Sequence, residues 1–599
     1  MHRIKVLIPG PWWNYLSYET DEAAVRGARV LVPVGRGTRV GLSLGPEESP
    51  PPAAKLKKVL RVIDQFPVLS ETYLRAAHIT SHAFLCSAAE VLHTLLPSSF
   101  WKGVSFPEYT ENRSAASSPP SFLYRYRDAE RWDSYRSQIL GCPSGVLCLF
   151  PERCQAKAFH AALTGLVPKK RLILWPASGA EAALKCWKQA LEQDNAVVIG
   201  APGAACAPLG SPGLIIIDDE SNPSWRAKSY PFFSVRSFAA SRARISGTKL
   251  LLGGRLPSSR IFKNFLPPAE KKRPEERRQL RFINLYDVPR VSFKGMQWPL
   301  PLADSLLAET ADHVASGEAV FWLLDRRGVT GEVQCADCGH PIQCSQCGTP
   351  MVFEAGMLRC PLCGRKAGLP EQCPVCGGKI LQGASPGLEA LLPMAQTLLG
   401  DRPVWLWHLD NPKTQTEAKK RLGELAKYGG LVLGSRRALS LLDTLHPRLI
   451  CWLDADSEAR QAHYASRFNA FSMLLESCWR GEGERQVVMQ TRSPGKGWQR
   501  GLQGGWELFW RSELPERQSL GFPPESNLVE ITIPPEWRDK DELAIKLDDA
   551  GFSSMEPDRR GSKLVVFAPK MAPLRRVLAE YFMIQRSRTG FPRIQVWTE

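Results

Sequence analysis

Residues 335–376 read CADCGHPIQCSQCGTPMVFEAGMLRCPLCGRKAGLPEQCPVC and contain four Cys-x-x-Cys pairs. A Cys-x-x-Cys turn brings two sulfurs to one side of a tight loop, at about the separation that a shared Zn2+ requires. The eight thiolates can therefore fill two tetrahedral zinc sites. Because closed four-sulfur sites leave no open coordination position, we expect these zincs to be structural rather than catalytic. The alternative, a disulfide cluster, is disfavoured because nothing in the sequence indicates secretion.

The size and charge of the chain point to a large globular protein with a polyanionic partner. Its 599 residues are 44% hydrophobic and 9% aromatic, which suggests about three to five domains. Lys and Arg outnumber Asp and Glu by 77 to 60, a net charge of +17, and nucleic acid leads the partners that this charge favours. No stretch approaches the roughly 18 apolar residues of a membrane span. Because no secretion signal is evident either, we expect a cytoplasmic protein with no membrane partner.

Hydrophobic patterning divides the chain into parts of different class. Short strand-like runs separated by glycines predict a β-rich beginning. Fully apolar runs such as Val146–Phe150 and Leu214–Ile217, separated by helical stretches, then predict parallel sheets covered on both faces. The predicted units are a β-rich N-terminal domain (1–102), a linker (103–121), a first α/β lobe (122–265), a second linker (266–302), a second α/β lobe (303–510) with the cysteine module (335–376) inserted, and an α+β C-terminal domain (511–599).

The order of these features resembles the PriA family, the primosomal replication-restart helicases of bacteria. Specific matches are the eight-cysteine spacing, Gly27-Ala-Arg-Val-Leu-Val-Pro-Val-Gly35, Leu323-Leu-Asp-Arg-Arg-Gly328 and Leu520-Gly-Phe-Pro-Pro524. The resemblance implies two RecA-like lobes of the superfamily 2 helicase fold and an N-terminal domain that captures a DNA 3′ end. It also implies that the outer cysteine pairs share one zinc (Cys335, Cys338, Cys373, Cys376) and the inner pairs a second (Cys344, Cys347, Cys360, Cys363).

The chain departs from that family where ATP would bind. A P-loop needs G-x-x-x-x-G-K-[ST], so that backbone N–H groups and Lys hold the phosphates. No such string occurs, and the segment Tyr124–Trp132 stands in its place. The strand Leu214–Ile217 ends in Asp218-Asp219-Glu220, where the family has Asp-Glu-Glu. These carboxylates could hold Mg2+ and a hydrolytic water, or they could be a solvated acidic turn that closes a strand.

Other elements that couple ATP to movement have changed as well. Gly253-Gly-Arg-Leu-Pro257 replaces the Gly-Ser-Ala-Thr-Pro expected by resemblance, and Gly434-Ser-Arg-Arg437 replaces Gly-Thr-Gln-Met. The segment Cys478–Arg485 lacks the paired arginines that would reach the γ-phosphate. Catalysis of phosphoryl transfer consists mostly of positioning and charge stabilisation, so these losses remove most of it. ATP and Mg2+ binding are therefore left in question, and no catalytic residue is assigned.

The expected DNA-binding residues lie in the N-terminal domain. By resemblance, the pocket for a strand end comprises Leu16, Ser17 and Tyr18 with the loop Gly35-Arg36-Gly37, and Arg29 and Arg39 lie nearby. Tyr18 could stack on a base while Arg36 or Arg39 neutralises phosphate. Ser17 stands where an acidic residue is expected, which leaves the preference for a 3′ hydroxyl open. The alternative is that Tyr18 is ordinary core and the arginines form a solvated hairpin face.

The sequence thus predicts a helicase-like protein, a degenerate relative of the family without a P-loop, that binds forked or branched DNA and helps to assemble the primosome at stalled forks. We expect it to lack helicase activity and to act at the nucleoid. The expected partners, by resemblance, are single-strand DNA-binding protein, other primosomal proteins and the replicative helicase or its loader. The alternative function is an active ATP-dependent 3′-to-5′ DNA helicase that uses an unconventional nucleotide site.

Overall fold

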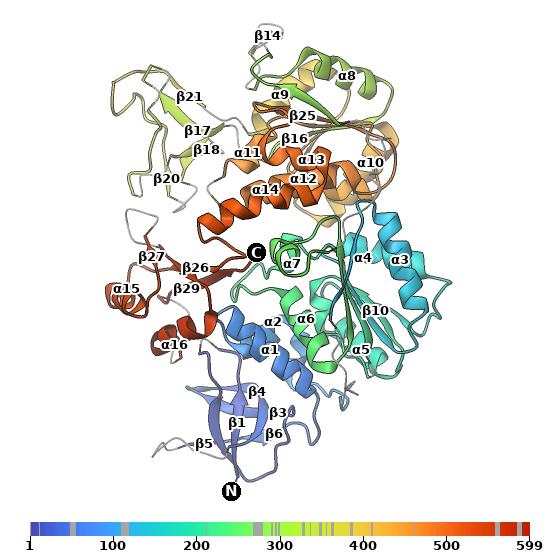
Figure 1. Ribbon diagram of the computed structural model, residues 1–599, viewed down its shortest axis with the longest axis vertical. Coiled ribbons are helices and arrows are strands. Elements are labelled where there is room, and N and C mark those ends of the chain that lie inside the picture. The colour runs from blue at the N-terminus through green and yellow to red at the C-terminus, as the bar shows by residue number, and fades with distance from the viewer. Residues whose placement is uncertain are drawn as a thin grey trace.

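A computed structural model describes the chain in five parts (Figure 1). The described residues are all of 1–599 except 1, 11, 48–55, 110–118, 211, 268–279, 289–291, 294–295, 298–299, 326–329, 336, 339, 347–349, 355, 361–364, 384–386, 409–410, 462, 557–562 and 584–589. Among them, no helix is long and apolar enough to cross a membrane.

The N-terminal part is a six-stranded sheet in the order β5-β2-β1-β4-β3-β6. Its strands are β1 (His2–Leu7), β2 (Leu16–Thr20), β3 (Arg29–Val34), β4 (Gly37–Pro46), β5 (Lys57–Lys58) and β6 (Arg61–Val62). Alternate residues of β1 and β3, such as Ile4, Val6, Val30 and Val32, form its core, as expected for strands with one buried face. Gly35, at φ +59°, lies in the β3–β4 hairpin. The predicted β-rich domain is confirmed.

Two helices follow this sheet and pack against the first lobe. They are α1 (Glu71–Ala83) and α2 (Ala88–Leu95), followed by the 3-10 turn η1 (Ser98–Lys102). The Tyr73 hydroxyl of α1 donates a hydrogen bond of 2.7 Å to the carbonyl of Ala207 in the lobe. These helices therefore join the N-terminal sheet to the lobe through one continuous core.

The first lobe is a parallel sheet in the order β7-β12-β11-β8-β10-β9. Its strands are β7 (Ser121–Tyr124), β8 (Gly145–Leu149), β9 (Leu172–Leu174), β10 (Val197–Gly200), β11 (Pro212–Ile217) and β12 (Lys249–Gly254). Its helices are α3 (Asp128–Leu140), α4 (Arg153–Leu163), α5 (Ala180–Leu191), α6 (Val235–Ser246) and α7 (Ser259–Phe265), with the 3-10 turns η2 (Pro202–Cys206) and η3 (Pro223–Trp225). Along β11, Ile215 and Ile217 join one core cluster, and Leu214 and Ile216 join another. Both faces of the sheet are therefore buried, as the continuous apolar runs predicted.

The second lobe repeats this architecture with the parallel order β13-β25-β24-β16-β23-β22. Its strands are β13 (Leu280–Asn284), β16 (Ala319–Leu323), β22 (Val404–Trp407), β23 (Gly430–Gly434), β24 (Leu449–Trp452) and β25 (Gln486–Thr491), with a small hairpin of β14 (Ser292–Phe293) and β15 (Met296–Gln297). Its helices are α8 (Asp304–Ala315), α9 (Leu388–Leu399), α10 (Gln415–Tyr428), α11 (Asp456–Ala459), α12 (Ser466–Trp479), α13 (Arg500–Gly504) and α14 (Trp506–Ser519), with η4 (Arg436–Asp443) and η5 (Gly497–Gln499).

The prediction that 266–302 is only a linker is wrong in part. Strand β13 lies inside that range and pairs with β25 along its whole length. Strand β13 lies at the sheet edge and its residues are only partly buried, so its sequence lacks the continuous apolar run that predicts the central strands.

Two smaller parts complete the chain. The cysteine module is a five-stranded sheet, β20-β19-β18-β17-β21, with β17 (Thr330–Cys335), β18 (Val352–Glu354), β19 (Met357–Arg359), β20 (Lys366–Ala367) and β21 (Leu381–Gly383). The C-terminal part is a four-stranded sheet, β27-β28-β26-β29, with β26 (Asn527–Thr532), β27 (Ser554–Met555), β28 (Lys563–Ala568) and β29 (Arg593–Trp597), and helices α15 (Lys540–Asp549) and α16 (Met571–Phe582). The predicted α+β character is confirmed.

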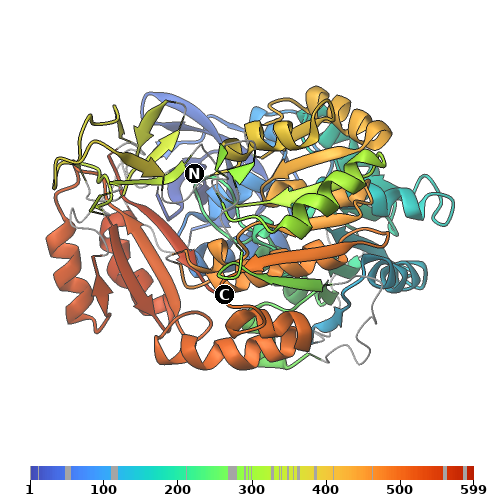
Figure 2. The same ribbon diagram turned by 90° about the horizontal axis from the view of Figure 1, so that it is seen from above.

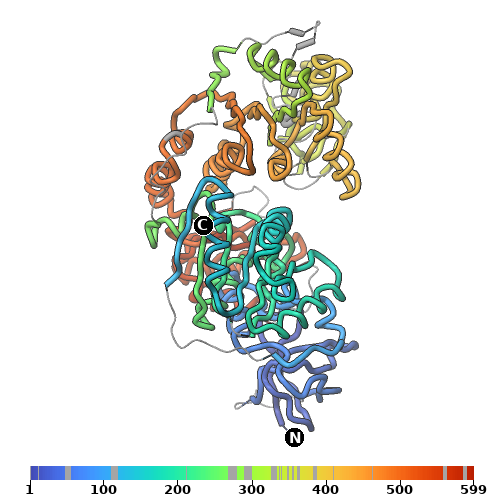
Figure 3. Tube along the Cα trace, turned by 90° about the vertical axis from the view of Figure 1, so that its right-hand side faces the viewer, coloured from blue at the N-terminus to red at the C-terminus, as the bar shows by residue number. Residues whose placement is uncertain are grey.

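The parts are arranged along one long axis. Figures 1 and 3 show the N-terminal sheet at one end, the first lobe in the middle and the second lobe at the other end. Seen from above, the cysteine module and the C-terminal part lie together on one side of the two lobes (Figure 2). The chain thus forms a two-lobed body with accessory modules along one flank.

Candidate functional site

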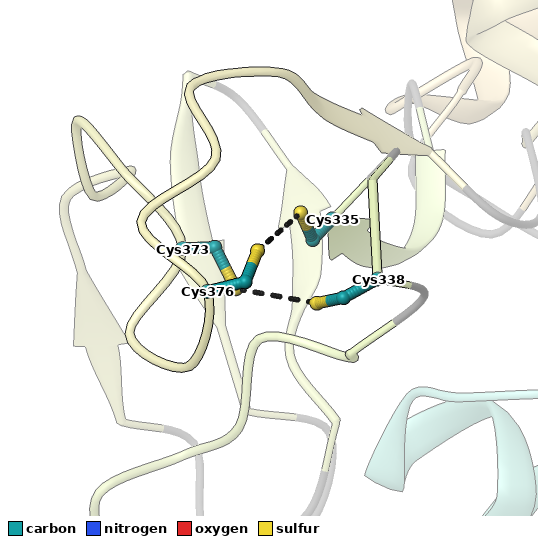
Figure 4. Close-up of side chains that lie close together, drawn as sticks. All are labelled: Cys335, Cys338, Cys373 and Cys376. Carbon is teal, nitrogen blue, oxygen red and sulfur yellow. Dashed lines mark hydrogen bonds between the residues drawn. The ribbon is translucent and has the colours of Figure 1, made fainter.

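The outer cysteine pairs converge on one point of the cysteine module (Figure 4). The sulfurs of Cys335, Cys338, Cys373 and Cys376 all lie within 4.8 Å of one another. The Cys335–Cys376 and Cys338–Cys373 sulfurs are 3.5 Å and 3.8 Å apart, close to the ~3.8 Å edge of a tetrahedron with zinc–sulfur bonds of about 2.3 Å. These four residues fit a metal ion such as zinc, which would supply structural rigidity and no open position for chemistry.

The inner pairs can be followed only in part. Cys344 and Cys360 are buried together with Val333 and Leu358 in the small core of the module. Cys347 and Cys363 lie outside the described residues. The four-residue set that was predicted for a second metal therefore stays a prediction.

The acidic residues that follow β11 are buried in the first lobe and paired with arginine. Asp218 is completely buried. Its Oδ1 accepts a hydrogen bond of 2.5 Å from Nε of Arg131 and one of 2.9 Å from the Tyr135 hydroxyl, both on α3. The alternative interpretation of this segment as a solvated acidic turn is therefore wrong, because helix α3 covers it.

A second arginine extends this network across the sheet. Asp128, the first residue of α3, accepts hydrogen bonds of 2.7 Å from Nη2 of Arg131 and 2.6 Å from Nη2 of Arg255. Nη1 of Arg255 also lies 3.3 Å from the Asp219 carboxylate. Arg131 and Arg255 are 0% and 2% exposed, so the charges neutralise one another away from water.

Glu220 is engaged in the same way. Its Oε1 accepts hydrogen bonds of 3.0 Å from the Tyr124 hydroxyl and 2.7 Å from the backbone N–H of Ser258. Its other oxygen forms an ion pair with Arg236. All three carboxylates that were considered for Mg2+ thus have partners from the protein itself.

The electrostatics of Asp128 reflect this pairing. Burial alone would raise the pKa of this carboxyl, but the guanidinium groups of Arg255 and Arg131 outweigh it and hold the pKa well below its ordinary value. Asp128 occupies the first turn of α3, where the amide groups of a helix favour an anion. The helix end that favours an anion therefore already carries a carboxylate of the chain itself.

These residues do not fit a nucleotide with its magnesium ion. Helix α3 follows β7 with Asp128 and Arg131 where a P-loop would present Gly, Lys and a hydroxyl. The carboxylates that could coordinate Mg2+ are hydrogen-bonded to arginine and tyrosine.

Sequence reasoning missed the arginines of this network. The sequence did contain an indication of these arginines, because Arg131 and Arg255 lie in two segments that depart from the family pattern.

One further arginine joins the two lobes. Arg480, at the end of α12, is 1% exposed. Its Nη1 and Nη2 donate hydrogen bonds of 3.1 Å and 2.7 Å to the two carboxylate oxygens of Glu152 in the first lobe, and its Nε donates one of 2.8 Å to Asp443. Burial opposes ionisation of Glu152, but Arg480 outweighs it and lowers the pKa of that carboxyl to about 2.

A second contact crosses the same boundary. The backbone N–H of Gly481 donates a hydrogen bond of 3.3 Å to Oδ2 of Asp128. The segment Cys478–Arg485, which lacks the paired arginines of the family, therefore holds the lobes together through contacts with protein groups.

The N-terminal sheet carries an open pocket at the predicted DNA-binding residues. It has a volume of about 590 Å³ and is lined by Tyr15, Ser17, Tyr18, Gly35 and Glu47 among others. Tyr18 is only 3% exposed and its hydroxyl is hydrogen-bonded to the carbonyl of Pro33. Its ring therefore forms the pocket wall and does not offer a free face for stacking, so that part of the prediction is wrong.

Two residues that sequence reasoning missed bear on this pocket. The Ser17 hydroxyl donates a hydrogen bond of 3.0 Å to Oε1 of Glu47, so a carboxylate lies beside the position where Ser17 replaces an acidic residue. Within the described part of the chain, Oε2 of Glu47 has no hydrogen-bond partner. Tyr15 is 38% exposed at the rim and faces the ammonium of Lys5 at 5.0 Å.

The basic residues predicted to bind DNA separate into two groups. Arg29 is completely buried, and its guanidinium binds Asp64 at 2.8 Å and the carbonyl of Phe100 at 2.9 Å. The prediction that Arg29 contacts DNA is wrong, because its guanidinium is buried against Asp64 and ties the sheet to η1 through the Phe100 carbonyl. Arg36 and Arg39 are exposed in the β3–β4 hairpin, and Nη1 of Arg39 donates to the carbonyl of Pro9 at 2.6 Å.

The sequence of this chain is similar to that of known proteins. Residues 5–97 match the family model of the PriA 3′DNA-binding domain (3′BD). The chain is 25% identical to the replication restart protein PriA of Treponema pallidum over 557 residues, 86% of this chain and 84% of that protein. It is 24% identical to the replication restart protein PriA of Thermotoga maritima over 403 residues, 65% of this chain and 53% of that protein, so this match spans about half of the relative.

Among solved structures, RecG bound to a three-way DNA junction matches this chain at a TM-score of 0.36 and 10% identity. The match covers 74% of this chain and 46% of the RecG chain. Dbp5 of S. cerevisiae bound to RNA and ADP BeF3 matches at a TM-score of 0.34 and 11% identity, covering 74% of this chain and 92% of that one.

Proposed function

Because this chain is a relative of the PriA replication restart proteins, we propose that it binds forked or branched DNA and helps to assemble the primosome at stalled replication forks without unwinding DNA. The observation that carries the proposal is the pairing of Asp218, Asp219 and Glu220 with the protein's own arginines. An ATP-driven motor needs carboxylates and helix N-termini that are free for Mg2+ and phosphate.

DNA binding is assigned to the pocket of the N-terminal sheet. Tyr15 at its rim offers an aromatic face for a terminal base, and the exposed Arg36 offers a charge to phosphate. The Glu47 carboxylate accepts a hydrogen bond from the 3′ hydroxyl in place of the acidic residue that Ser17 has lost.

In this proposal the lobes serve as a fixed body for docking at the nucleoid. The buried contacts of Arg480 with Glu152 support it, because they hold the lobes together without nucleotide. The partners that we propose for the docking surfaces are single-strand DNA-binding protein, other primosomal proteins and the replicative helicase or its loader.

The cysteine module is proposed to hold two zinc ions that stiffen a sheet with a small core. We expect metal analysis to find two zinc ions per chain. Cys373→Ser should remove one of them and leave the unfolding of the lobes unchanged, because a closed site is a local fold. Cys451→Ser, a buried cysteine of β24 far from the module in sequence, is the control and should keep both. A single zinc in the native chain would contradict the pairing scheme.

The experiment that tests the function combines binding and turnover on forked DNA. We expect saturable fork binding that is unchanged by ATP, and ATP hydrolysis equal to that of the Glu220→Gln variant. Hydrolysis that is stimulated by forked DNA and lost in Glu220→Gln would overturn the proposal in favour of an active 3′-to-5′ helicase.

A further inference from the structure

A second pocket lies where the two lobes meet the C-terminal part. Its volume is about 380 Å³, and it is lined from the first lobe by the loop after β11 and the start of α7, from the second by residues 461, 463–465, 468 and 469 and by α14, and from the C-terminal part by the end of β29. This pocket is separate from the network around Asp218, although Glu220 and Arg236 border both.

The pocket collects hydrogen-bond donors that no described residue accepts from. They are Nε and Nη2 of Arg226, Nη2 of Arg517, Nε2 of His463 and Oγ of Ser259. His463 belongs with the donors because its Nδ1 accepts a hydrogen bond of 3.2 Å from the backbone N–H of Ala465, which leaves the proton on Nε2. Buried donors without acceptors are costly, and the four residues that carry them all line this one pocket, which favours a ligand that only accepts.

Of the three arginines at the pocket, Arg236 and Arg517 are paired with carboxylates, which leaves the charge of Arg226 to favour an anion. The Arg226 guanidinium lies 3.7 Å from the centre of the Trp597 ring and has no carboxylate within ion-pair distance among the residues that the structure describes. Burial lowers the pKa of this arginine to about 10, although Tyr464 and Glu530 partly oppose that change. Arg236, by contrast, is neutralised by Glu220 and Glu599.

Arg517 adds a deeply buried guanidinium, which is paired with Glu513. It is 3% exposed, lies 5.3 Å and 5.2 Å from the ring centres of Tyr464 and Trp510, and its Nε donates to Glu513 at 3.1 Å. Its Nη1 donates to the carbonyl of Pro523, and its Nη2 has no acceptor among the described residues. The rings fix both arginines in place, which reduces the entropy that a bound ligand would otherwise cost.

We propose that this junction pocket binds a phosphate group through Arg226, Arg517, His463 and Ser259. A phosphate offers several acceptor oxygens in a tetrahedral array, which matches donors from two guanidinium groups, an imidazole and a hydroxyl. Both a DNA backbone phosphate and a free phosphorylated small molecule have this chemistry.

The test measures binding of inorganic phosphate to the full chain at constant ionic strength by isothermal titration calorimetry. We expect saturable binding to the native chain and an affinity at least tenfold weaker in Arg226→Gln. The control is Arg511→Gln on α14, the helix of Arg517. The Arg511 side chain is 70% exposed and pairs with Glu507, so its affinity should stay within twofold of the native value.

Ser259→Ala supplies a variant that keeps every charge, in case Arg226→Gln does not fold, and it should weaken phosphate about threefold or more. Competition separates the two sources of phosphate. Displacement by a single-stranded oligonucleotide would assign the pocket to DNA, and displacement only by a nucleoside monophosphate would assign it to a small molecule. Absence of saturable phosphate binding to the native chain, or equal binding by the native chain, Arg226→Gln and Ser259→Ala, would overturn the proposal.

Discussion

The buried network around Asp218 in the first lobe and the pocket of the N-terminal sheet both contain carboxylates, but the carboxylates are paired differently. In the network, Asp218 is completely buried and bound to Arg131 and Tyr135. In the N-terminal pocket, Glu47 shares one oxygen with Ser17 and keeps the other without a partner in the described part of the chain. The first carboxylate is fully paired within the fold, whereas the second has one oxygen without a partner among the described residues, which is why we propose it as an acceptor for DNA.

The carboxylate of Asp218 therefore has a structural role, and the carboxylate of Glu47 has a proposed role in binding. Buried ion pairs contribute little net stability when complete, but a carboxylate that loses its arginine becomes an unpaired buried charge. Mutations in the network around Asp218 should therefore change the free energy of unfolding, and mutations in the N-terminal pocket should change the affinity for DNA.

The largest effect is expected at Arg131. Arg131→Met leaves Asp218 and part of Asp128 without their charge partner in a buried site. We expect the free energy of unfolding to fall by about 3–5 kcal/mol, measured by urea denaturation.

The control is Arg136→Met on the same helix, because that side chain is 36% exposed and pairs with the exposed Asp133. It should change the free energy of unfolding by less than about 0.5 kcal/mol. Adding Asp218→Asn to Arg131→Met should restore part of the loss. Equal stability of the two single variants would contradict this prediction, since it would mean that the network around Asp218 does not depend on its ion pairs.

The next effect concerns acid. The pKa of Glu152 is lowered from 4.5 to about 2, so the unfolded chain takes up a proton at higher pH than the folded chain does. The stabilisation by Arg480 is therefore complete above about pH 4.5 and is lost progressively as the pH falls toward about 2.

Glu152→Gln removes this titration. We expect it to lower stability at pH 7 and to flatten the dependence of the unfolding free energy on pH between 4.5 and 2, measured by denaturation at a series of pH values. Glu192→Gln, at the exposed end of α5, is the control and should keep the native profile. An unchanged acid profile in Glu152→Gln would show that the lobes do not rely on this contact.

The sequence predicted more of the fold than of the sites. The apolar runs at Val146–Phe150 and Leu214–Ile217 appear as β8 and β11, because buried parallel strands need continuous apolar sequence whatever their neighbours are. The spacing likewise predicted metal-binding Cys-x-x-Cys turns, because each short turn is fixed locally, whereas the grouping of Cys335, Cys338, Cys373 and Cys376 into one set came from the resemblance to the family.

The contacts that decide function are long-range and have no local pattern. Arg131 and Asp218 are 87 residues apart, and Ser17 and Glu47 are 30 apart. The sequence showed that the P-loop is missing, but it did not show that Arg131 binds the carboxylate of Asp218. For the same reason it assigned Arg29 to DNA, although Asp64 and Phe100 bury it.

A smaller effect, confined to DNA binding, is expected at Glu47. A carboxylate accepts from a 3′ hydroxyl and repels a 3′ phosphate, so native protein should prefer strands that end in a hydroxyl. Glu47→Gln should reduce that preference about tenfold, equivalent to about 1.4 kcal/mol, measured by fluorescence anisotropy with both strand ends. Glu22→Gln, in an exposed loop of the same sheet, should leave the preference intact. Equal preference in Glu47→Gln and native protein would remove Glu47 from the site.

The smallest effect is expected at Arg36, which is exposed at the hairpin beside the pocket. If it contacts one phosphate, Arg36→Gln weakens binding to all sequences alike and lowers the slope of log affinity against log salt concentration by about 1. Arg29→Gln is the instructive comparison, because Arg29 is buried against Asp64. It should reduce the unfolding free energy while the salt slope of the folded fraction stays native. A slope that changes with Arg29→Gln and not with Arg36→Gln would place the DNA on another face of the sheet. The N-terminal pocket would then not be the DNA site that contrasts with the fully paired network around Asp218.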